Sequence, residues 1–544
     1  MLQMIPDHPD LSLLFYTTIS AGLLGFVLAV IRRGREKPWK MVPGWLPIVG
    51  HFHYVGGTPM MAQMLEEWAE KHSEDVGCYE IDLMGVKYVV VSREDRAMEV
   101  LKQRPHKVQR IPGIREASDS TGATGVFSAE GSLWKEEKKL ISAALNRNSI
   151  NDFLSSMKDN AKRLVQKWNC DIGGHGDNNN SKIQPISLDI GHATADAISK
   201  VMLDQDFDFL NNPESKMAHN VFTGFRGWIL RTLSPIWYWR IPLIGQDLDG
   251  YGKYYRYLNQ VFNRAVDDFE KRKKEASNNN DSNSNYNKMF LGKLYQAMEQ
   301  EKSNLSRQRV VGNIYTAFAA GIDTTSKTLV STLYALAMDQ KVQEELREHV
   351  KDFDIDDGSS TLQDLYTWLP MLKSFMHEIH RWYAVPFIML RVAEEIPFCG
   401  STMLLPGQDV LVLGRYLSVK PDATDVPLGP DNAPPTEFNH QRYLVPLETE
   451  DSDCNNDNKD IQKWTCPGPS DKSTGFLNFG HGVRKCPGRV FSEAFSYYVL
   501  IAILQNFQFE LAPNQPPVKI VFDSVMTPDT QIQLKLTKLS NTTD

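Results

Sequence analysis

The chain has 544 residues, of which 42% are hydrophobic and 23% are charged, and its formal net charge at pH 7 is −8. This apolar content is sufficient for a large core, and the acidic balance gives no reason to expect nucleic acid as a partner. Six cysteines are scattered without a C-x-x-C pair, which argues against a disulfide scaffold and indicates a reducing compartment.

Residues 11–31 carry no charged side chain. As a helix, a stretch of this length would measure about 30 Å, the thickness of a bilayer's hydrocarbon core. Basic residues follow it at Arg32, Arg33, Arg35, Lys37 and Lys40, so the positive-inside rule predicts a cytosolic location for the rest of the chain. We therefore expect a luminal segment at 1–10 and a transmembrane anchor at 11–31. A buried core helix is the alternative, and Asp7 and Asp10 argue against a further one, a plastid or mitochondrial transit peptide.

Prolines at 38, 43 and 47 make residues 32–50 a basic, stiff connector, and residues 51–544 form the remaining domain. Residues 79–91 read as a β-hairpin, 93–102 as a helix and 108–127 as a long Gly/Ser/Thr-rich loop. The next helix opens at Gly131 and places Trp134 and Lys138 on one face; a solvated basic face that includes Lys135 and Lys139 is the alternative.

Aromatic residues gather at 222–242, with Trp228, Trp237, Tyr238 and Trp239 around Pro235. A lid that touches a membrane interface and ordinary core packing are both open for residues 228–239. The Asn-rich run at 278–287 reads as a surface loop.

Residues 307–338 have the apolar period of one long helix, but its middle reads A-G-I-D-T-T at 320–325. Gly321, Asp323 and the two threonines are poor helix formers, and a Thr hydroxyl can bond to the preceding turn. The pattern predicts room for a small ligand beside an acid–alcohol pair, Asp323 and Thr324. A break between two helices is the alternative.

The helix predicted at 370–383 carries Glu378 and Arg381 on one face. An apolar run at 386–389 suits a pocket wall, and strand-like runs follow at 394–398 and 409–413. Residues 448–473 form an acidic, polar segment that holds Cys454 and Cys466, and residues 518–539 read as a hairpin whose turn near 524–528 reaches a pocket.

The most specific stretch is F-G-H-G-V-R-K-C-P-G at 479–488. Gly480 and Gly482 permit a tight turn, Arg484 offers a fixed fork for a carboxylate, and Cys486 precedes an apolar helix at 489–500. A helix N-terminus favours thiolate, so we interpret Cys486 as a metal ligand rather than an inert buried thiol. The pattern matches by chance in roughly 10⁻⁵ or fewer of chains this long. A second C-P-G at 466–468 lacks the upstream residues, and we assign it no role.

This loop resembles the haem-binding loop of the cytochrome P450 family, the family in which a cysteine thiolate holds the haem iron. With the Trp134 helix, A-G-x-D-T-T and E-x-x-R in the same order, the resemblance extends over roughly residues 43–539. It implies a mainly α fold with a small β-rich subdomain (the cytochrome P450 fold), plus one N-terminal transmembrane helix.

The resemblance also implies roles for particular residues. Cys486 would be the axial ligand of haem b (iron protoporphyrin IX), packed by Phe479 and Gly488. The propionate partners would be Trp134, Lys138 (where Arg is usual), Arg391 and Arg484. Asp323 would relay protons and Thr324 would hold the activated oxygen. In F-N-H-Q-R-Y, where His440 and Gln441 replace Pro and Glu, Arg442 would complete a structural triad with Glu378 and Arg381.

The implied function is a haem-thiolate monooxygenase that inserts one atom of O2 into a lipophilic substrate: a fatty acid, a sterol or another isoprenoid. The membrane-anchored members imply an endoplasmic reticulum membrane location and electrons from NADPH through NADPH–cytochrome P450 reductase, with cytochrome b5 as a further donor. Candidate acceptors of that acidic partner are Lys135, Lys139, Lys485 and Arg489. The segment 448–473 either tunes this docking or is an inert loop.

Three alternatives stay open. An isomerase or dehydratase of the same family would rearrange a peroxide without O2, and would have no use for Asp323 and Thr324. A non-enzymatic haem sensor or carrier would not need the acid–alcohol pair either. A zinc site from Cys454, Cys466, His481 and Cys486 matches no compact zinc spacing.

Overall fold

The computed structural model describes residues 37–54, 58–73, 76–173, 180–234, 237–242, 245–278, 285–447, 464–470 and 473–539. The expected luminal segment 1–10 and anchor 11–31 lie outside these ranges, as does most of the segment 448–473. Within the described ranges, no helix combines the length and the apolar character needed to cross a bilayer.

Helices make up most of the described chain. They are α2 Met61–His72, α3 Glu94–Leu101, α4 Pro112–Asp119, α5 Gly131–Ala144, α6 Arg147–Gly173, α7 Ile186–Leu203, α8 Lys216–Leu233, α9 Tyr251–Asn278, α10 Phe290–Gln300, α11 Arg307–Met338, α12 Gln340–Val350, α13 Leu362–Trp368, α14 Pro370–Trp382, α15 Gly414–Val419 and α16 Arg489–Asn506.

The strands are short. They are β1 Cys78–Leu83, β2 Val86–Val91, β3 Val108–Arg110, β4 Ser181–Pro185, β5 Ile388–Val392, β6 Ile396–Phe398, β7 Thr402–Leu404, β8 Asp409–Val412, β9 Val445–Pro446, β10 Trp464–Thr465, β11 Phe507–Leu511, β12 Ile520–Asp523, β13 Val525–Pro528 and β14 Gln533–Lys538. The expected mainly α fold with a small β-rich part is confirmed.

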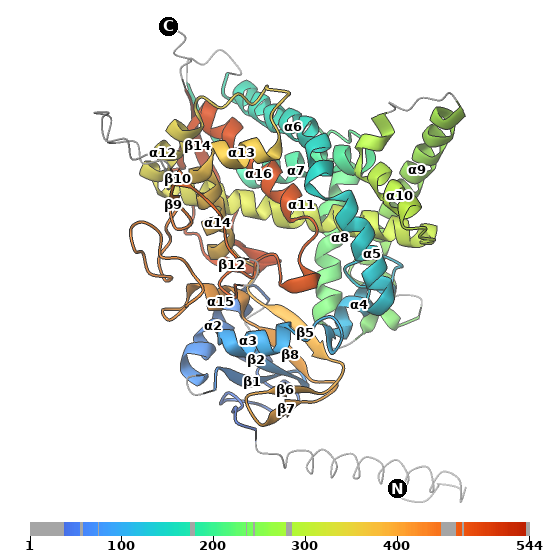
Figure 1. The fold of residues 1–544 in the computed structure, drawn as a ribbon, viewed down its shortest axis with the longest axis vertical. Helices are drawn as coiled ribbons and strands as arrows, with labels where there is room; N and C mark the ends of the chain where they lie inside the picture. Colours follow the sequence, from blue (N-terminus) through green and yellow to red (C-terminus); the bar gives the residue numbers. More distant parts are fainter. Residues whose placement is uncertain are drawn as a thin grey trace, which may run out of the picture.

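The central helix α11 crosses the middle of the molecule, and α6, α7 and α16 lie on one side of it (Figure 1). Its first residue follows Ser306, whose hydroxyl accepts a hydrogen bond from the Arg309 N–H and caps the helix. The helix continues without interruption through residues 320–325, so a break between two helices is wrong. Gly321 permits the close approach of α7, because a Cβ there would lie 2.9 Å from Cδ1 of Ile198.

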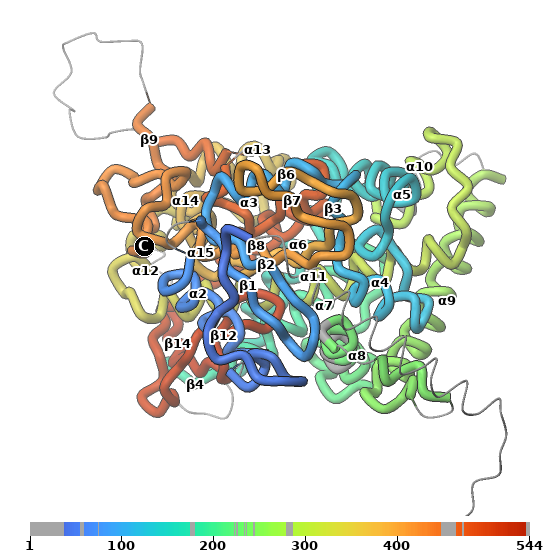
Figure 2. The backbone as a smooth tube through the Cα atoms, turned by 90° about the horizontal axis from the view of Figure 1, so that it is seen from below, coloured from blue at the N-terminus to red at the C-terminus, as the bar shows by residue number. Residues whose placement is uncertain are grey.

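A five-stranded sheet with the order β1-β2-β8-β5-β3 forms the β-rich end, seen at the bottom of Figure 1 and facing the viewer in Figure 2. The hairpin predicted at 79–91 is confirmed as β1 and β2, joined at Gly85 with φ +89°. Strands β2 and β8 are parallel, and β8 pairs antiparallel with β5 so that Arg391 lies opposite Asp409.

Two predicted segments are wrong in detail. Residues 108–127 are not one loop, because they contain β3 and then α4, which begins at Pro112 as its first helical residue. Residues 518–539 are not one hairpin: β12 and β13 form a hairpin, while β14 pairs with β11 and β4 in another sheet. Local alternation predicted strands correctly but did not identify their partners.

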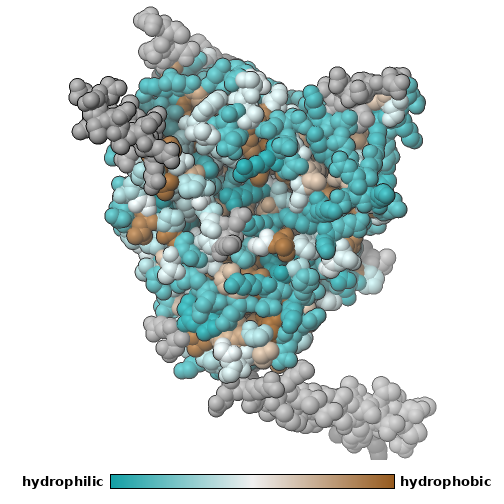
Figure 3. Space-filling model, viewed as in Figure 1, coloured by the Kyte–Doolittle hydropathy of each residue, from teal (hydrophilic) through white to brown (hydrophobic). Residues whose placement is uncertain are grey.

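The aromatic segment is divided between core and surface. Trp239 is buried, Trp228 donates to the Ser118 hydroxyl at 3.2 Å, and Trp237 is 40% exposed beneath the Arg240 guanidinium. On the face drawn in Figure 3, apolar residues are scattered among hydrophilic ones. The cysteines within the described ranges form no disulfide, although Sγ of Cys78 and Cys399 lie 3.9 Å apart.

Candidate active site

The segment 479–488 forms a tight loop directly before α16. The Cys486 N–H donates to the Phe479 carbonyl at 2.8 Å, and the Gly480 N–H donates to the Leu477 carbonyl at 2.8 Å. Gly480 and Gly482 have φ of +76° and +60°, a region that other residues rarely adopt. The predicted need for glycine in this loop is therefore confirmed, and it places the cysteine at the start of α16.

Part of the Cys486 side chain is accessible to solvent. Protein atoms nevertheless surround the sulfur closely enough for burial to affect its pKa. Burial raises the pKa of its thiol, while the N–H groups of Gly488 and Arg489 and the charges of Lys138 and Arg110 act in the opposite direction. The two observations agree if the sulfur faces an internal hollow rather than the outer surface. The N–H groups at the start of α16 thus favour the thiolate, as expected, while burial of the sulfur acts against it.

Positive charge converges on this sulfur. Burial lowers the pKa of Arg110 to about 10, and burial together with Arg110 and Arg484 lowers the pKa of Arg104 to about 9. The carboxylate that faces them is Glu130, which forms an ion pair with Arg484 and accepts from the Arg110 N–H at 3.1 Å. The Nε atoms of Arg104 and Arg110 are buried and have no hydrogen-bond partner. Such a cluster requires an anion to neutralise it.

Trp134, Lys138 and Arg484 lie together in this cluster, as predicted. The Arg484 guanidinium stacks on the Trp134 ring, with 3.9 Å between Cζ and the ring centroid. Lys138 donates to the Lys485 carbonyl at 2.5 Å, and burial lowers its pKa. The helix α5 and the cysteine loop are thereby joined through side chains 347 residues apart in the chain.

Arg391 does not join this cluster. Its guanidinium makes a bidentate pair with Asp409, at 2.6 Å for both hydrogen bonds, because strand register places the two residues opposite each other. Sequence reasoning missed Arg110, whose charge acts on the Cys486 thiol, and Arg104, which lies near Arg110 and Arg484. They carry no motif, and only the Arg content of residues 104–110, the stretch that includes β3, could have pointed to them. The propionate role of Arg391 stays a prediction that the pairing does not favour.

The acid–alcohol pair lies in the middle of α11. Thr324 Oγ1 donates to the Ala320 carbonyl at 2.8 Å, as predicted, and Ala320 is exposed although Phe318 and Ile322 beside it are buried. Asp323 pairs with Lys327 at 2.7 Å and accepts from Ser524, in the turn between β12 and β13. Burial raises the pKa of Asp323, and Lys327 opposes the shift. Ser524, in the turn predicted to reach a pocket, therefore contacts Asp323.

Apolar side chains lie next to this turn. The Met526 N–H donates to the Ala384 carbonyl at 3.2 Å, and the rings of Phe387 and Phe522 lie 4.9 Å apart. On the other side, the Val126 N–H donates to the Asn313 side chain of α11 at 2.7 Å. Segments far apart in the chain thus enclose the middle of α11 with mostly apolar groups.

The predicted triad is assembled. Glu378 accepts from Arg381 at 2.6 and 2.7 Å and from Arg442 at 3.1 Å, and all three side chains are fully buried. The Asn439 N–H adds a fourth interaction at 2.8 Å. Each guanidinium also donates to backbone carbonyls, among them Ser418 for Arg381 and Pro427 for Arg442. The charges are therefore paired, which makes their burial tolerable.

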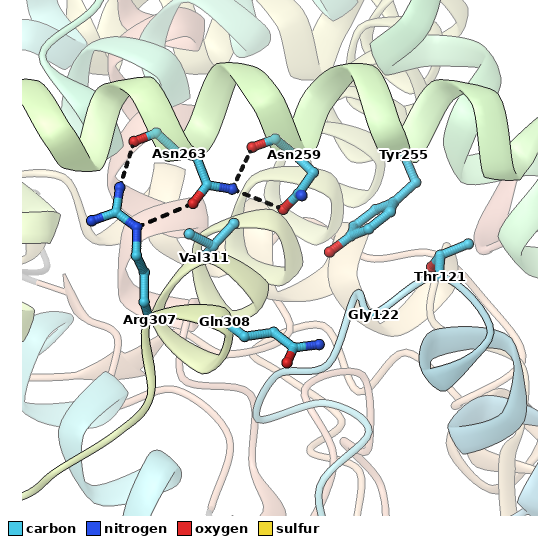
Figure 4. Close-up of a pocket in the computed structure, with 8 residues that line it drawn as sticks. All are labelled: Thr121, Gly122, Tyr255, Asn259, Asn263, Arg307, Gln308 and Val311. Atoms are coloured by element: carbon cyan, nitrogen blue, oxygen red, sulfur yellow. Dashed lines mark hydrogen bonds between the residues drawn. The ribbon is translucent and has the colours of Figure 1, made fainter.

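A separate polar pocket of about 270 Å³ lies between α9, the start of α11 and the segment after α4 (Figure 4). Arg307 donates to Asn263, which donates to Asn259. Val311, at the base, lies 13 residues before Thr324, roughly 20 Å along a helix. The pocket is therefore distinct from the space beside Cys486.

Two of the basic residues expected to bind a redox partner already pair with acidic residues of this chain. Lys139 forms an ion pair with Glu301, and Arg489 donates to Glu493 at 2.8 Å. The zinc alternative is not supported, because Cys454 lies outside the described residues and Cys466, His481 and Cys486 do not form a group of converging ligands within them.

The residues around Cys486 fit a haem. A thiol at a glycine-rich loop offers the iron ligand, and buried guanidinium groups in excess over Glu130 match two carboxylates. The orphaned Nε atoms of Arg104 and Arg110 are donors that such carboxylates would satisfy.

Comparison with known proteins agrees with this geometry. The family model described as Cytochrome P450 matches residues 41–536. Similar proteins include Protein LUTEIN DEFICIENT 5, chloroplastic, of Arabidopsis thaliana, 24% identical over 86% of this chain and 73% of its own. Sterol 26-hydroxylase, mitochondrial, of Mus musculus is 24% identical (77% and 74%), and 25-hydroxyvitamin D-1 alpha hydroxylase, mitochondrial, of Homo sapiens is 23% identical (83% of each).

These names contradict the expected endoplasmic reticulum location, since the relatives are named as chloroplastic or mitochondrial proteins. That expectation is wrong.

Proposed function

Because the chain belongs to the cytochrome P450 family, we propose that it is a haem-thiolate monooxygenase whose substrate is a lipophilic isoprenoid such as a sterol. The family and the hydroxylase relatives make the chain an oxidoreductase of the monooxygenase type. The observation that carries the proposal is the Cys486 sulfur beside the cations Arg110 and Lys138, with Arg104 next to Arg110. A buried thiol next to unneutralised guanidinium groups suits a metalloporphyrin that brings both an iron and two carboxylates.

When bound, the haem supplies the iron that activates O2. Cys486 would hold it, and the N–H groups of Gly488 and Arg489 would stabilise the sulfur's negative charge. Arg110, Arg484 and Lys138 would orient the porphyrin by neutralising its carboxylates.

Proton delivery is the task of the polar groups on α11. Lys327 bridges Asp323 at 2.7 Å and Asp523 at 3.1 Å, and Asp523 is 58% exposed. This bridge links solvent to a carboxyl whose raised pKa lets it carry a proton closer to neutral pH. Thr324, whose hydroxyl donates to the Ala320 carbonyl at 2.8 Å, would hold the next proton of this path at its Oγ1.

The substrate class rests on the apolar wall and on the relatives. Phe387 and Phe522, with the half-buried Ile388 and Met389, suit a rigid hydrocarbon. Two of the relatives are named as hydroxylases of a sterol and of a vitamin D. A fatty acid remains the comparison substrate in the test.

Electrons would come from a separate redox protein. NADPH–cytochrome P450 reductase is the first donor to test, with cytochrome b5 as a second, and Lys135 is an exposed cation on the same helix as Lys138. An acidic partner would be steered by such charges, so turnover should fall as ionic strength rises.

The test has two parts. The reduced carbonyl complex of the purified protein should show the red-shifted Soret band of a thiolate-bound haem, and Cys486→Ser should lose that band. Turnover of sterols should then require both a reductant and O2. A Soret band that survives in Cys486→Ser would refute the ligand assignment.

An isomerase or dehydratase acting on a peroxide is the second candidate. It would need no proton relay, so the bridge from Asp523 through Lys327 to Asp323 argues against it. Conversion of a lipid hydroperoxide without reductant or O2, and no oxygen insertion, would favour that candidate.

A further inference from the structure

A cluster of potential metal ligands lies outside the site described above. His377 and His380 project from α14, and Glu493 projects from α16. Their ligand atoms all lie within 4.8 Å of one another, and the three side chains are buried. The two histidines are three residues apart, so they share one face of their helix.

The imidazoles lack partners. Nδ1 and Nε2 of His377 and Nδ1 and Nε2 of His380 are all buried and make no hydrogen bond. An unsatisfied buried polar atom costs about 1–3 kcal/mol, so an arrangement of four such atoms needs a compensating ligand. Burial lowers the pKa of His380 to about 3 and that of His377 well below its usual value, so both rings are neutral.

We propose that His377, His380 and Glu493 bind one divalent transition-metal ion, of which Zn²⁺ is the matching type. Two neutral imidazoles and one carboxylate are ligands that Zn²⁺ accepts, with water or another donor in the fourth position. The ion would join α14, which carries the Glu378–Arg381 pair, to α16, which follows Cys486. Its role would be to hold these helices together, and it is independent of the haem iron.

The site must contract to close on a metal. Zn–N bonds of about 2.0–2.1 Å in a tetrahedron separate neighbouring ligand atoms by about 3.4 Å, and here the ligand atoms lie within 4.8 Å of one another. Movements of the three side chains by about 1 Å or less would give the tetrahedral spacing.

Other charged and polar groups border the cluster. Arg489 donates to Oε1 of Glu493 at 2.8 Å and disfavours a nearby cation, and the Tyr366 hydroxyl donates to Oε2 at 3.2 Å. Lys373 adds positive charge near His377, although its ammonium group donates to the Cys466 carbonyl at 2.5 Å. A metal ion would therefore have to displace Arg489 from one carboxylate oxygen, which limits its affinity.

The second C-P-G, at 466–468, has a role here. A Cβ at Gly468 would lie 2.8 Å from Nε2 of His377, so only glycine leaves this nitrogen unobstructed. The rings of Tyr443 and Phe476 pack edge-on against His377 at 5.5 and 5.9 Å. His380 likewise packs edge-on against Phe479, at 4.9 Å. Aromatic neighbours thus exclude bulk water from the imidazoles.

The experiment uses the full-length, tag-free holoprotein with one haem per chain, so that zinc cannot enter the porphyrin site. After treatment with a chelator, the protein is titrated with Zn²⁺, separated from free metal by gel filtration, and assayed for zinc and iron. We expect one zinc per iron. The zinc K-edge absorption spectrum should show imidazole and oxygen ligands and no sulfur.

His377→Gln and His380→Gln should each weaken zinc binding at least 100-fold, since each removes one of three ligands. His349→Gln on α12 is the matched control, because His349 accepts from the Met371 N–H and lies outside the cluster. Its zinc content should equal that of the unaltered protein. Haem content is measured in all variants, which separates this result from a failure of the proposed function.

If a glutamine variant does not fold, the unaltered protein decides the matter. Zn²⁺ should then raise its melting temperature in a concentration-dependent way, and Mg²⁺, which prefers oxygen ligands, should not. Zinc content no higher than in a buffer blank, equal zinc content in His380→Gln, or a sulfur ligand in the spectrum would each overturn the proposal.

Discussion

The reassignment of the haem's carboxylate partners leads to the sharpest prediction. The sequence pattern points to Arg391, whereas the structure places Arg110 beside Cys486 with an unpartnered Nε and joins Arg391 to Asp409. Arg110→Gln keeps a polar, though shorter, side chain and removes the charge. If Arg110 holds a haem carboxylate, this variant should release haem faster.

The magnitude follows from the lost interaction. A hydrogen bond to a charged group contributes about 1.5–3 kcal/mol, and each 1.4 kcal/mol is tenfold, so haem should leave roughly 10- to 150-fold faster. The haem-free protein should not lose stability, because burial and the neighbouring Arg104 and Arg484 make this guanidinium unfavourable without an anion. Transfer of haem to excess apomyoglobin, followed at the Soret band, measures the rate.

Arg391 provides the matched control. Arg391→Gln leaves Asp409, which is 3% exposed, without its partner, so it should cost stability by about 3–5 kcal/mol and leave the haem release rate unchanged. Adding Asp409→Asn should recover most of that stability. The reasoning is refuted if the Arg391→Gln/Asp409→Asn protein loses haem at least tenfold faster while Arg110→Gln does not.

Three further predictions concern the buried charges and α11. Glu378→Gln leaves two fully buried guanidinium groups without their carboxylate and should lower the stability of the protein by about 3–5 kcal/mol, measured as a lower denaturant midpoint. Glu344→Gln, on the exposed side of α12, is the control and should have little effect. Burial raises the pKa of Asp323, so the folded state favours the protonated carboxyl. The free energy of unfolding of the wild type relative to Asp323→Asn should therefore be largest below pH of about 3.9 and should fall as pH rises through the raised pKa. A difference in denaturant midpoint that does not change with pH would contradict this sign. Gly312→Ala should destabilise the protein by about 1–3 kcal/mol despite a gain in helix propensity, since the added Cβ would overlap the Thr124 carbonyl. Gly173→Ala is the control, because there is open space around Gly173. A Gly312→Ala protein more stable than the wild type would refute the observed packing.

Local chemistry allowed much of this molecule to be predicted from residue order. Glycines at 480 and 482 and a cysteine before an apolar helix determine the haem loop, because the constraint is a matter of backbone angles within ten residues. The Thr324 bond to the turn before it is equally local. The hairpin at 79–91 and the helix at 307–338 follow from period and composition.

Side-chain partners depended on contacts that the order of residues does not reveal. Arg391 pairs with Asp409 because β5 and β8 pair in one particular register, and Arg110 reaches Cys486 because β3 lies at the edge of that sheet. Strand β14, at 533–538, pairs with β11 and β4 rather than with β13, the strand before it in the chain. Pairing between such distant strands depends on how the whole core packs. His377 and His380 are visible in the sequence as H-x-x-H, but Glu493 lies 113 residues after His380, and only the tertiary structure brings its carboxylate to their unpartnered nitrogens.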